Sequence, residues 1–244
     1  SPTVGAGENG SNMGALGVGC GILEFINYVA TTGSDETGDG SEENPYATIQ
    51  KGIDLSDHGY TVSVAAGVYQ ENINFNGKNI AVIGDDIETT FIDGSSNNER
   101  VVTFENGEDT TAVLSGFSIM FGQGGIEVDN SSPKLEDLII AYNHANDYGG
   151  GIKAENSQLI IRDCDIYFNQ ASYFGGGLYL NDVECDMTNV VIANCIADSG
   201  NAIGMRNSNL DLYYCTIYSD QENYSAIQLI SYYYSNTIQI KNSI

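Results

Sequence analysis

The chain has 244 residues with 33 acidic and 8 basic side chains, which gives a formal net charge of −25 at pH 7. Phosphate backbones and anionic lipids bind proteins through Lys and Arg, so this balance argues against nucleic acid and anionic membranes as partners. No apolar run approaches the roughly 20 residues that cross a bilayer, which argues against membrane insertion. The chain begins with Ser1 and Pro2 and shows no signal peptide, so we expect a processed protein or a piece of a longer one.

Residues 27–60 are predicted to form an acidic loop and a short capping helix. The helix is expected over 44–55, with Asn44 as its N-cap, a proline in its first turn, and Ile49 and Ile53 on an apolar stripe. Helix-period patterns are missing from the part of the chain that carries the repeat described below. The helix is therefore predicted to cap a structure built from strands.

The acidic loop before that helix carries spaced carboxylates between Gly33 and Glu43. Because oxygen donors of this kind bind Ca²⁺, we predict calcium as a cofactor, with Asp35, Asp39 and Glu43 as its ligands. The spacing is not that of an EF-hand, and acidic turns without a metal are common. A metal-free turn is therefore the alternative.

From residue 61 to residue 244 the apolar residues alternate, which predicts strands with one face inward. Runs at 61–69 and 79–84 come first, and an internal repeat follows. Its aliphatic anchors, which step by 26, 26, 25 and 24 residues, are Ile126, Ile152, Leu178, Ile203 and Ile227. A second pattern contains Leu159, Ile161, Cys164 and Ile166, and recurs as Cys185, Met187, Val190 and Ile192 and as Leu210, Leu212, Cys215 and Ile217.

A period of about 25 residues with short strands and glycine-rich corners is typical of a coil whose rungs stack on one another. No rung can bury its inner face alone, so each needs a neighbour above and below. The sequence therefore predicts an all-β chain folded as a parallel β-helix. Two corner columns agree with this fold: one consists of Asn143, Asn169, Cys195 and Ser219, and the other of Ala145, Ala171 and Ala197.

The five cysteines show neither the spacing of a zinc site nor that of a disulfide framework. Cys164 and Cys215 are expected in one column with Val190 between them, so they lie two rungs apart, about 9–10 Å. That separation is too long for a disulfide. Buried free thiols that pack as small apolar groups are the favoured interpretation.

The opening of the coil contains the segments 47–50, 66–72, 83–85 and 89–94. In these residues the chain resembles the pectin-lyase-like right-handed parallel β-helix superfamily, and pectin methylesterases have a similar opening. The resemblance extends over roughly residues 27–244 and implies a right-handed coil. It implies little about activity, because function on such a fold lies in grafted sites.

The catalytic motifs of that superfamily are largely missing. The chain has no Trp and no Gln–Asp segment of the kind that esterase members use. Polygalacturonase-like members need both a His–Gly pair and an Arg-x-Lys motif, and this chain has one His–Gly pair, His58–Gly59, but no Arg-x-Lys. This pattern favours a non-enzymatic protein.

One set of side chains remains as the candidate site of an alternative enzyme, a calcium-dependent lyase. Lys153 is flanked on outward strand positions by Glu127, Asp129 and Glu155. The competing interpretation is a solvated ion pair between rungs. His144 is expected to be a surface turn residue.

The two ends of the chain do not match. Residues 1–26 resemble the segment that often closes such β-helices, whereas the coil over 61–244 is expected to be open at its C-terminal end. Such an end is an aggregation hazard unless something covers it. The chain is then a piece of a longer array, or the first segment of one subunit covers the open end of the next. The predicted interface residues are Met13, Leu16, Tyr232, Tyr233, Tyr234, Ile238, Ile240 and Ile244.

The sequence thus favours a non-enzymatic extracellular structural protein, a subunit of a head-to-tail filament or a cell-surface adhesin. The alternative is a calcium-dependent polysaccharide-binding protein or polysaccharide lyase. The expected partners are other copies of the chain and, for the alternative, a polysaccharide. The acidic composition, rich in Asn, Ser, Thr and Tyr, suits a secreted or surface protein, and glycosylation sequons begin at Asn9, Asn130 and Asn223.

Overall fold

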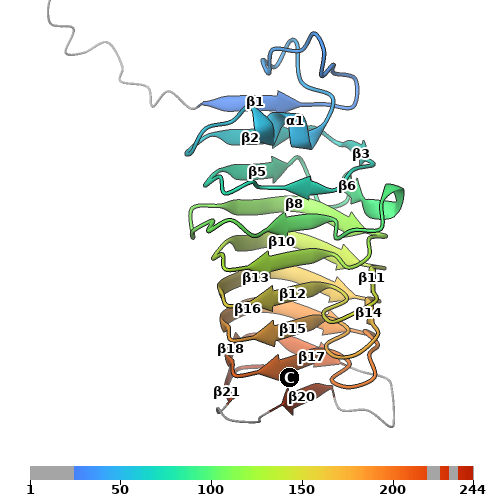
Figure 1. The fold of residues 1–244 in the computed structure, drawn as a ribbon, viewed down its shortest axis with the longest axis vertical. Coiled ribbons are helices and arrows are strands. Elements are labelled where there is room, and N and C mark those ends of the chain that lie inside the picture. The colour runs from blue at the N-terminus through green and yellow to red at the C-terminus, as the bar shows by residue number, and fades with distance from the viewer. Residues whose placement is uncertain (1–24, 219–225, 231–235, 244) are drawn as a thin grey trace, which may run out of the picture.

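The structure is a computed structural model and describes residues 25–218, 226–230 and 236–243. Its strands stack along one axis, from β1 at one end to β20 and β21 at the other (Figure 1). The helical elements among the described residues are α1 (Ile49–Asp54) and the single 3₁₀ turn η1 (Gly94–Ser96). None of the described helices is both long and apolar enough to cross a membrane. The predicted all-β fold is confirmed.

Three parallel sheets form the sides of the coil. Sheet 1 consists of β1 (Ile26–Val29), β2 (Thr61–Val64), β3 (Gly67–Tyr69), β5 (Ala81–Gly84), β6 (Thr90–Asp93), β8 (Val113–Met120), β10 (Lys134–Ala141), β13 (Gln158–Tyr167), β16 (Glu184–Ala193), β18 (Asn209–Tyr213), β19 (Thr216–Tyr218) and β21 (Thr237–Lys241). Sheet 2 consists of β4 (Ile73–Asn74), β7 (Val102–Phe104), β9 (Ile126–Asp129), β12 (Ile152–Glu155), β15 (Leu178–Asn181), β17 (Ile203–Arg206) and β20 (Ile227–Ile230). Sheet 3 consists of β11 (His144–Ala145) and β14 (Gln170–Ala171).

The strand register confirms the repeat. The five aliphatic anchors are direct partners along sheet 2, from Ile126 through Ile152 and Leu178 to Ile203 and Ile227. The second pattern is aligned along sheet 1 in the same way, with Cys164 opposite Val190. Because each rung buries its apolar column against the next, one continuous core runs along the coil.

Each long strand of sheet 1 bends at one residue with a positive φ. In β10, β13 and β16 these residues are Asp137, Asp163 and Asn189, with φ between 53° and 55°. The pairing register omits them, so the strand continues on both sides of the bend. Asp and Asn tolerate this left-handed conformation better than most residues, which explains why they recur there.

The two predicted corner columns are present among the described residues. Asn143 and Asn169 are buried and bond to each other, whereas Ser219 lies outside the described residues. In the same column Cys195 is also buried, and its thiol donates to the backbone oxygen of Ile166. The alanine column forms a small apolar cluster of its own, made of Ala145, Ala171 and Ala197.

The capping helix begins later than predicted. Its N-cap is Thr48 and not Asn44, which instead donates its side-chain amide to the backbone oxygen of Thr37. The reason is that Tyr46 bridges to Val29 at the outer edge of β1, so the chain is still extended there. The two predicted apolar residues, Ile49 and Ile53, are buried against the first rung as expected.

Cys164, Cys185, Cys195 and Cys215 are buried free thiols, as predicted, and Cys20 lies outside the described residues. Burial raises the pKa of Cys164 to about 12 and that of Cys195 to about 11. These groups are therefore neutral thiols that fill core columns, and they are poor nucleophiles at neutral pH.

Candidate functional site

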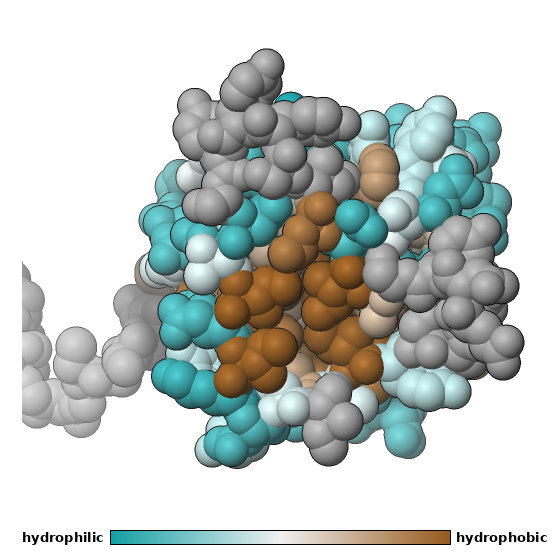
Figure 2. Space-filling view, turned by 90° about the horizontal axis from the view of Figure 1, so that it is seen from below, coloured by the Kyte–Doolittle hydropathy of each residue, from teal (hydrophilic) through white to brown (hydrophobic). Residues whose placement is uncertain are grey.

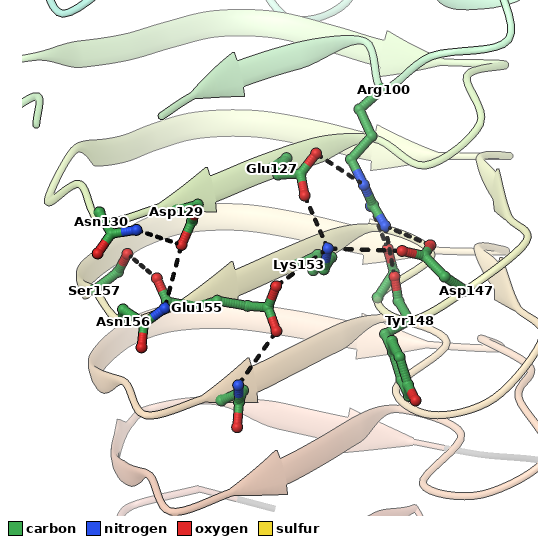
Figure 3. A network of polar contacts seen from close by, with 12 residues as sticks. Arg100, Glu127, Asp129, Asn130, Asp147, Tyr148, Lys153, Glu155, Asn156 and Ser157 are labelled. Carbon is green, nitrogen blue, oxygen red and sulfur yellow. Dashed lines mark hydrogen bonds and ion pairs between the residues drawn. The ribbon is translucent and has the colours of Figure 1, made fainter. Parts of the chain in front are cut away.

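Outward side chains of sheet 2 form an ionic network with the loop before β12 (Figure 3). Lys153 points outward because its neighbours Ile152 and Ala154 occupy the core. Its Nζ atom lies 2.9 Å from Glu127 Oε1, 3.2 Å from Glu155 Oε2 and 3.6 Å from Asp147 Oδ2. The first two carboxylates come from the adjacent rung and from the same strand, as alternation and register require.

Arg100 is the second cation of this network and was not predicted from the sequence. It lies before β7 and is 8% exposed. Its guanidinium donates to the backbone oxygens of Gly149 and Tyr148 at 2.7 and 2.6 Å and to Asp147 Oδ1 at 2.8 Å. Glu127 lies 3.7 Å from its Nε atom. Arg100 therefore fixes the loop that carries Asp147.

The ionic network affects the pKa of its two cations, Lys153 and Arg100, in different ways. Burial by itself would lower the pKa of Lys153, but Glu127 and Glu155 outweigh that effect and raise the pKa above its ordinary value. Burial lowers the pKa of Arg100, and Asp147 and Glu127 oppose the shift. Arginine stays charged in proteins even so. Both groups are thus cations that tie neighbouring rungs together.

The predicted residue Asp129 does not join Lys153. Its carboxylate accepts from the side-chain amides of Asn130 and Asn156 at 2.8 and 3.3 Å. These two asparagines directly follow β9 and β12. Of the four residues of the candidate enzyme site, the structure brings together Lys153, Glu127 and Glu155. It adds Arg100 and Asp147, which come from outside the repeat pattern on which the prediction was based.

A polar cleft of about 490 Å³ opens beside this network. It is lined by carboxylates, amides, one hydroxyl and one guanidinium, from Asn74, Asn98, Glu99, Arg100, Thr103, Glu105, Gln123, Glu127, Asn146 and Asp147. On the other side of Lys153, the ring of Tyr148 stacks on that of Tyr179, with 4.6 Å between the ring centroids. Tyr179 is buried, so this ring pair packs the loop before β12 against β15.

The three predicted calcium ligands do not form a common site. Asp35 accepts from the backbone nitrogens of Ala47 and Thr48 and from the Thr48 hydroxyl, at 2.8, 3.1 and 2.8 Å. Asp39 accepts from the nitrogen and hydroxyl of Ser41, and Glu43 is exposed. Within the described ranges, no group of three acidic, His or Cys side chains is arranged to hold a metal. Calcium binding by these residues stays a prediction.

The histidines lie at the surface of the coil. His144 is exposed on β11, where it pairs with Gln170 in sheet 3. His58 accepts from the backbone nitrogen of Asn79 through Nδ1, at 3.0 Å. Neither makes an ion pair among the described residues.

The end of the coil at β20 and β21 presents an apolar cross-section, which we call the tail end (Figure 2). Leu229 and Ile240 are 46% and 59% exposed, although their partners one rung earlier, Met205 and Leu212, are 0% and 1% exposed. Ile238 is partly buried against the core. A small apolar cavity of about 180 Å³ between Leu212, Ile217, Ala226, Ile227, Ile240 and Ser243 opens here.

The tail end contains two of the predicted interface residues, Ile238 and Ile240. The others, Met13, Leu16, Tyr232, Tyr233, Tyr234 and Ile244, lie outside the described residues. The head-to-tail arrangement therefore stays a prediction.

No protein-family model matches this chain, and no curated protein matches it. Two solved structures are similar to it at 14% sequence identity. The match to a pectin methylesterase from carrot covers 88% of this chain and 83% of that protein, with a TM-score of 0.46. The pectate lyase Pel9A covers 91% of this chain, which spans 78% of that one, with a TM-score of 0.39.

The stacked parallel sheets and the rung length decide the architecture. The fold is a parallel β-helix. At 14% identity and with TM-scores of 0.46 and 0.39, no activity follows from either similarity for this chain.

Proposed function

We propose that this protein is a non-enzymatic structural protein of the cell exterior that associates with a second copy through the tail end. The observation that carries the proposal is the exposure of Leu229 and Ile240 in columns that are buried everywhere above them. Exposed apolar surface of this kind is typical of a protein–protein contact, because burying it removes the surface from water.

The state of Lys153 supports a structural role for the ionic network. A lyase-type general base must be unprotonated at the operating pH. Glu127, Glu155 and Asp147 surround Lys153 and raise its pKa, so it is held as an ammonium. Arg100, with four partners around its guanidinium, is committed to the loop before β12.

The self-association is tested by sedimentation velocity of the full chain over a wide concentration range. We expect the sedimentation coefficient to rise with concentration. Ile240→Lys should abolish the rise, because a charge cannot be buried unpaired. Val68→Lys is the matched control, since Val68 is 60% exposed on β3, far from the tail end, and should behave as the wild type. A wild-type protein that stays monomeric throughout would overturn the proposal.

The polar cleft favours a second candidate function, polysaccharide binding with calcium as a bridging ion. Its carboxylates, Glu99, Glu105, Glu127 and Asp147, repel an acidic polysaccharide unless a divalent cation lies between them. Titration calorimetry with polygalacturonate, with and without calcium, tests this candidate. We expect calcium-dependent heat that weakens in Glu105→Gln; heat that is absent in both conditions would eliminate it. Product release by the wild type and its loss in Lys153→Ala would indicate a lyase.

A further inference from the structure

We propose that a cleft at the head of the coil, the end formed by β1, binds an organic cation with an apolar body. This head cleft has a volume of about 420 Å³ and lies between the outer face of β1, β2 and β5 and the loop that follows β1 (Figure 1). It shares no lining residue with the polar cleft or with the cavity at the tail end. The proposal is therefore independent of the proposed self-association.

Small outward side chains form the floor of the head cleft. Ser63 of β2 lies directly between Tyr28 of β1 and Ile83 of β5, which are its partners in the strand register. All three face outward, because the residues that alternate with them are buried. Ala30 and Ala65 directly follow the last register pair of β1 and β2 and also line the cleft. Since Ser and Ala extend less far from a sheet than Tyr and Ile, the surface is hollow over β2.

The loop that follows β1 forms the opposite wall, and hydrogen bonds hold it in place. The backbone oxygen of Gly40 accepts from Tyr28 N at 2.9 Å, and that of Pro45, which lines the cleft, accepts from Ser34 N at 3.1 Å. The side-chain amide of Asn44 donates to the backbone of the same loop at 2.9 Å. The head cleft is thus formed before a ligand binds, so binding does not have to order the loop.

Two carboxylates without a protein partner line the head cleft. Glu42 comes from the loop, Asp85 directly follows β5, and both are exposed. Neither carboxylate accepts a hydrogen bond or forms an ion pair within the described part of the chain. Residues 25–99 contain 13 acids and two lysines, and one of these, Lys78, already donates to the last carbonyls of α1. The head cleft therefore attracts a positively charged ligand and repels an anion.

The apolar part of the lining distinguishes between kinds of cation. A metal ion such as Ca²⁺ needs six or more oxygen ligands, and no group of three acidic, His or Cys side chains among the described residues is arranged to hold one. An alkylammonium ion instead places its charge beside Glu42 or Asp85 and its chain against Tyr28 and Ile83. Ile83 is 41% exposed, so this contact removes apolar surface from water. The ligand class is therefore a primary amine with an aliphatic chain.

Methyl NMR titration of the full chain with hexylammonium tests this proposal, because the methyl groups of Ile83 report directly on the head cleft. We expect saturable shifts at Ile83 and at least tenfold weaker binding of two control probes. Methylammonium has the charge without the chain, and 1-hexanol has the chain without the charge. The absence of a saturable shift at Ile83 would overturn the proposal, and so would equally tight binding of either control.

Two neighbouring acids separate the site from the general charge of the protein. Asp85→Asn should weaken hexylammonium binding about fivefold, because Asp85 lines the cleft. Asp86→Asn removes the same charge from an exposed residue that does not line the cleft, so it should bind as the wild type does. Equal weakening in the two variants would assign the binding to the overall negative charge and contradict the site. The three probes on the wild type decide the matter even if a variant fails to fold.

Discussion

Asn169 and Asn143 are joined across successive rungs by two hydrogen bonds to a single atom. Asn169 Oδ1 accepts from the backbone nitrogen of Asn143 at 3.0 Å and from its side-chain amide at 3.1 Å. Asn169 Nδ2 in turn donates to the backbone oxygen of Ile140 at 2.7 Å. Both residues are buried, so these bonds satisfy polar groups at the corner that follows β10.

The variant Asn169→Ala should therefore be strongly destabilised. It leaves a buried N–H of Asn143 and the oxygen of Ile140 without these partners, and each such group costs about 1–3 kcal/mol. We expect a loss of about 2–4 kcal/mol in the free energy of unfolding, measured by urea titration. Asn146→Ala is the control, because Asn146 is exposed and bonds to the Gln123 side chain at the surface. Equal losses in the two variants would show that the corner bonds add no special stability.

Replacing Arg100, which is buried, should cost more stability than replacing Arg162, which is exposed. Arg100 is buried against two carbonyls and two carboxylates, whereas the Arg162 side chain is 52% exposed and lies 3.8 Å from Glu136. Removing one partner of a buried ion pair costs about 3–5 kcal/mol, and a surface pair contributes about 0–1 kcal/mol. We expect losses of these sizes for Arg100→Gln and Arg162→Gln in urea unfolding. A loss below about 1 kcal/mol for Arg100→Gln would contradict the structural role of the network.

An exposed aromatic column tests the balance between ring stacking and backbone strain. Phe121, Tyr142 and Phe168 all have positive φ, and the ring of Tyr142 stacks on that of Phe168 with 5.4 Å between centroids. In the next rung the column continues with Asn194, also at positive φ. The stack contributes about 0.5–1.5 kcal/mol, and the left-handed backbone costs a bulky residue about as much.

Phe168→Asn should therefore change the free energy of unfolding by less than about 1 kcal/mol, because it loses the ring and relieves the backbone. Phe168→Val loses the ring and keeps a β-branched residue at positive φ, so we expect it to be less stable than Phe168→Asn by about 1–2 kcal/mol. Thermal and urea unfolding of the pair measure this difference. The reverse order would show that backbone strain does not matter at this corner.

Glu71 gives the stability a defined pH dependence. Its carboxylate accepts from the backbone nitrogens of Ile49 and Gln50 at 2.8 and 3.0 Å. Burial raises its pKa above the ordinary value of 4.5, against the lowering effect of these two bonds, and Asp35 adds to the rise. A carboxyl group with a raised folded-state pKa stabilises the fold below its unfolded pKa, and this contribution is lost as pH rises through the folded value.

The free energy of unfolding of the wild type should therefore fall relative to that of Glu71→Gln as pH rises from about 4 to about 7. The comparison with the variant removes the general effect of the net charge. Glu43→Gln, at an exposed acid, serves to correct for the loss of one charge. A difference between wild type and Glu71→Gln that stays constant or grows with pH would contradict the assignment.

The sequence by itself determined the side of the coil that each residue of the repeat faces. Alternation assigns Ile152 and Ala154 to the core and Lys153 to the surface, and the 25-residue period aligns Cys164 with Val190. Both follow from local geometry, because a strand has a side-chain period of two and each rung copies the one before it.

Only the tertiary structure decided which outward side chains meet. Arg100 reaches Asp147, 47 residues away, because the segment before β7 lies beside the loop before β12 on the coil. Asp129 faces the same way as Glu127 yet bonds to asparagines at the strand ends. The helix has Thr48 and not Asn44 as its N-cap because Tyr46 pairs with the edge of β1. The contacts of a long side chain or a loop depend on the surface around it, and the periodic pattern of the sequence does not predict that surface.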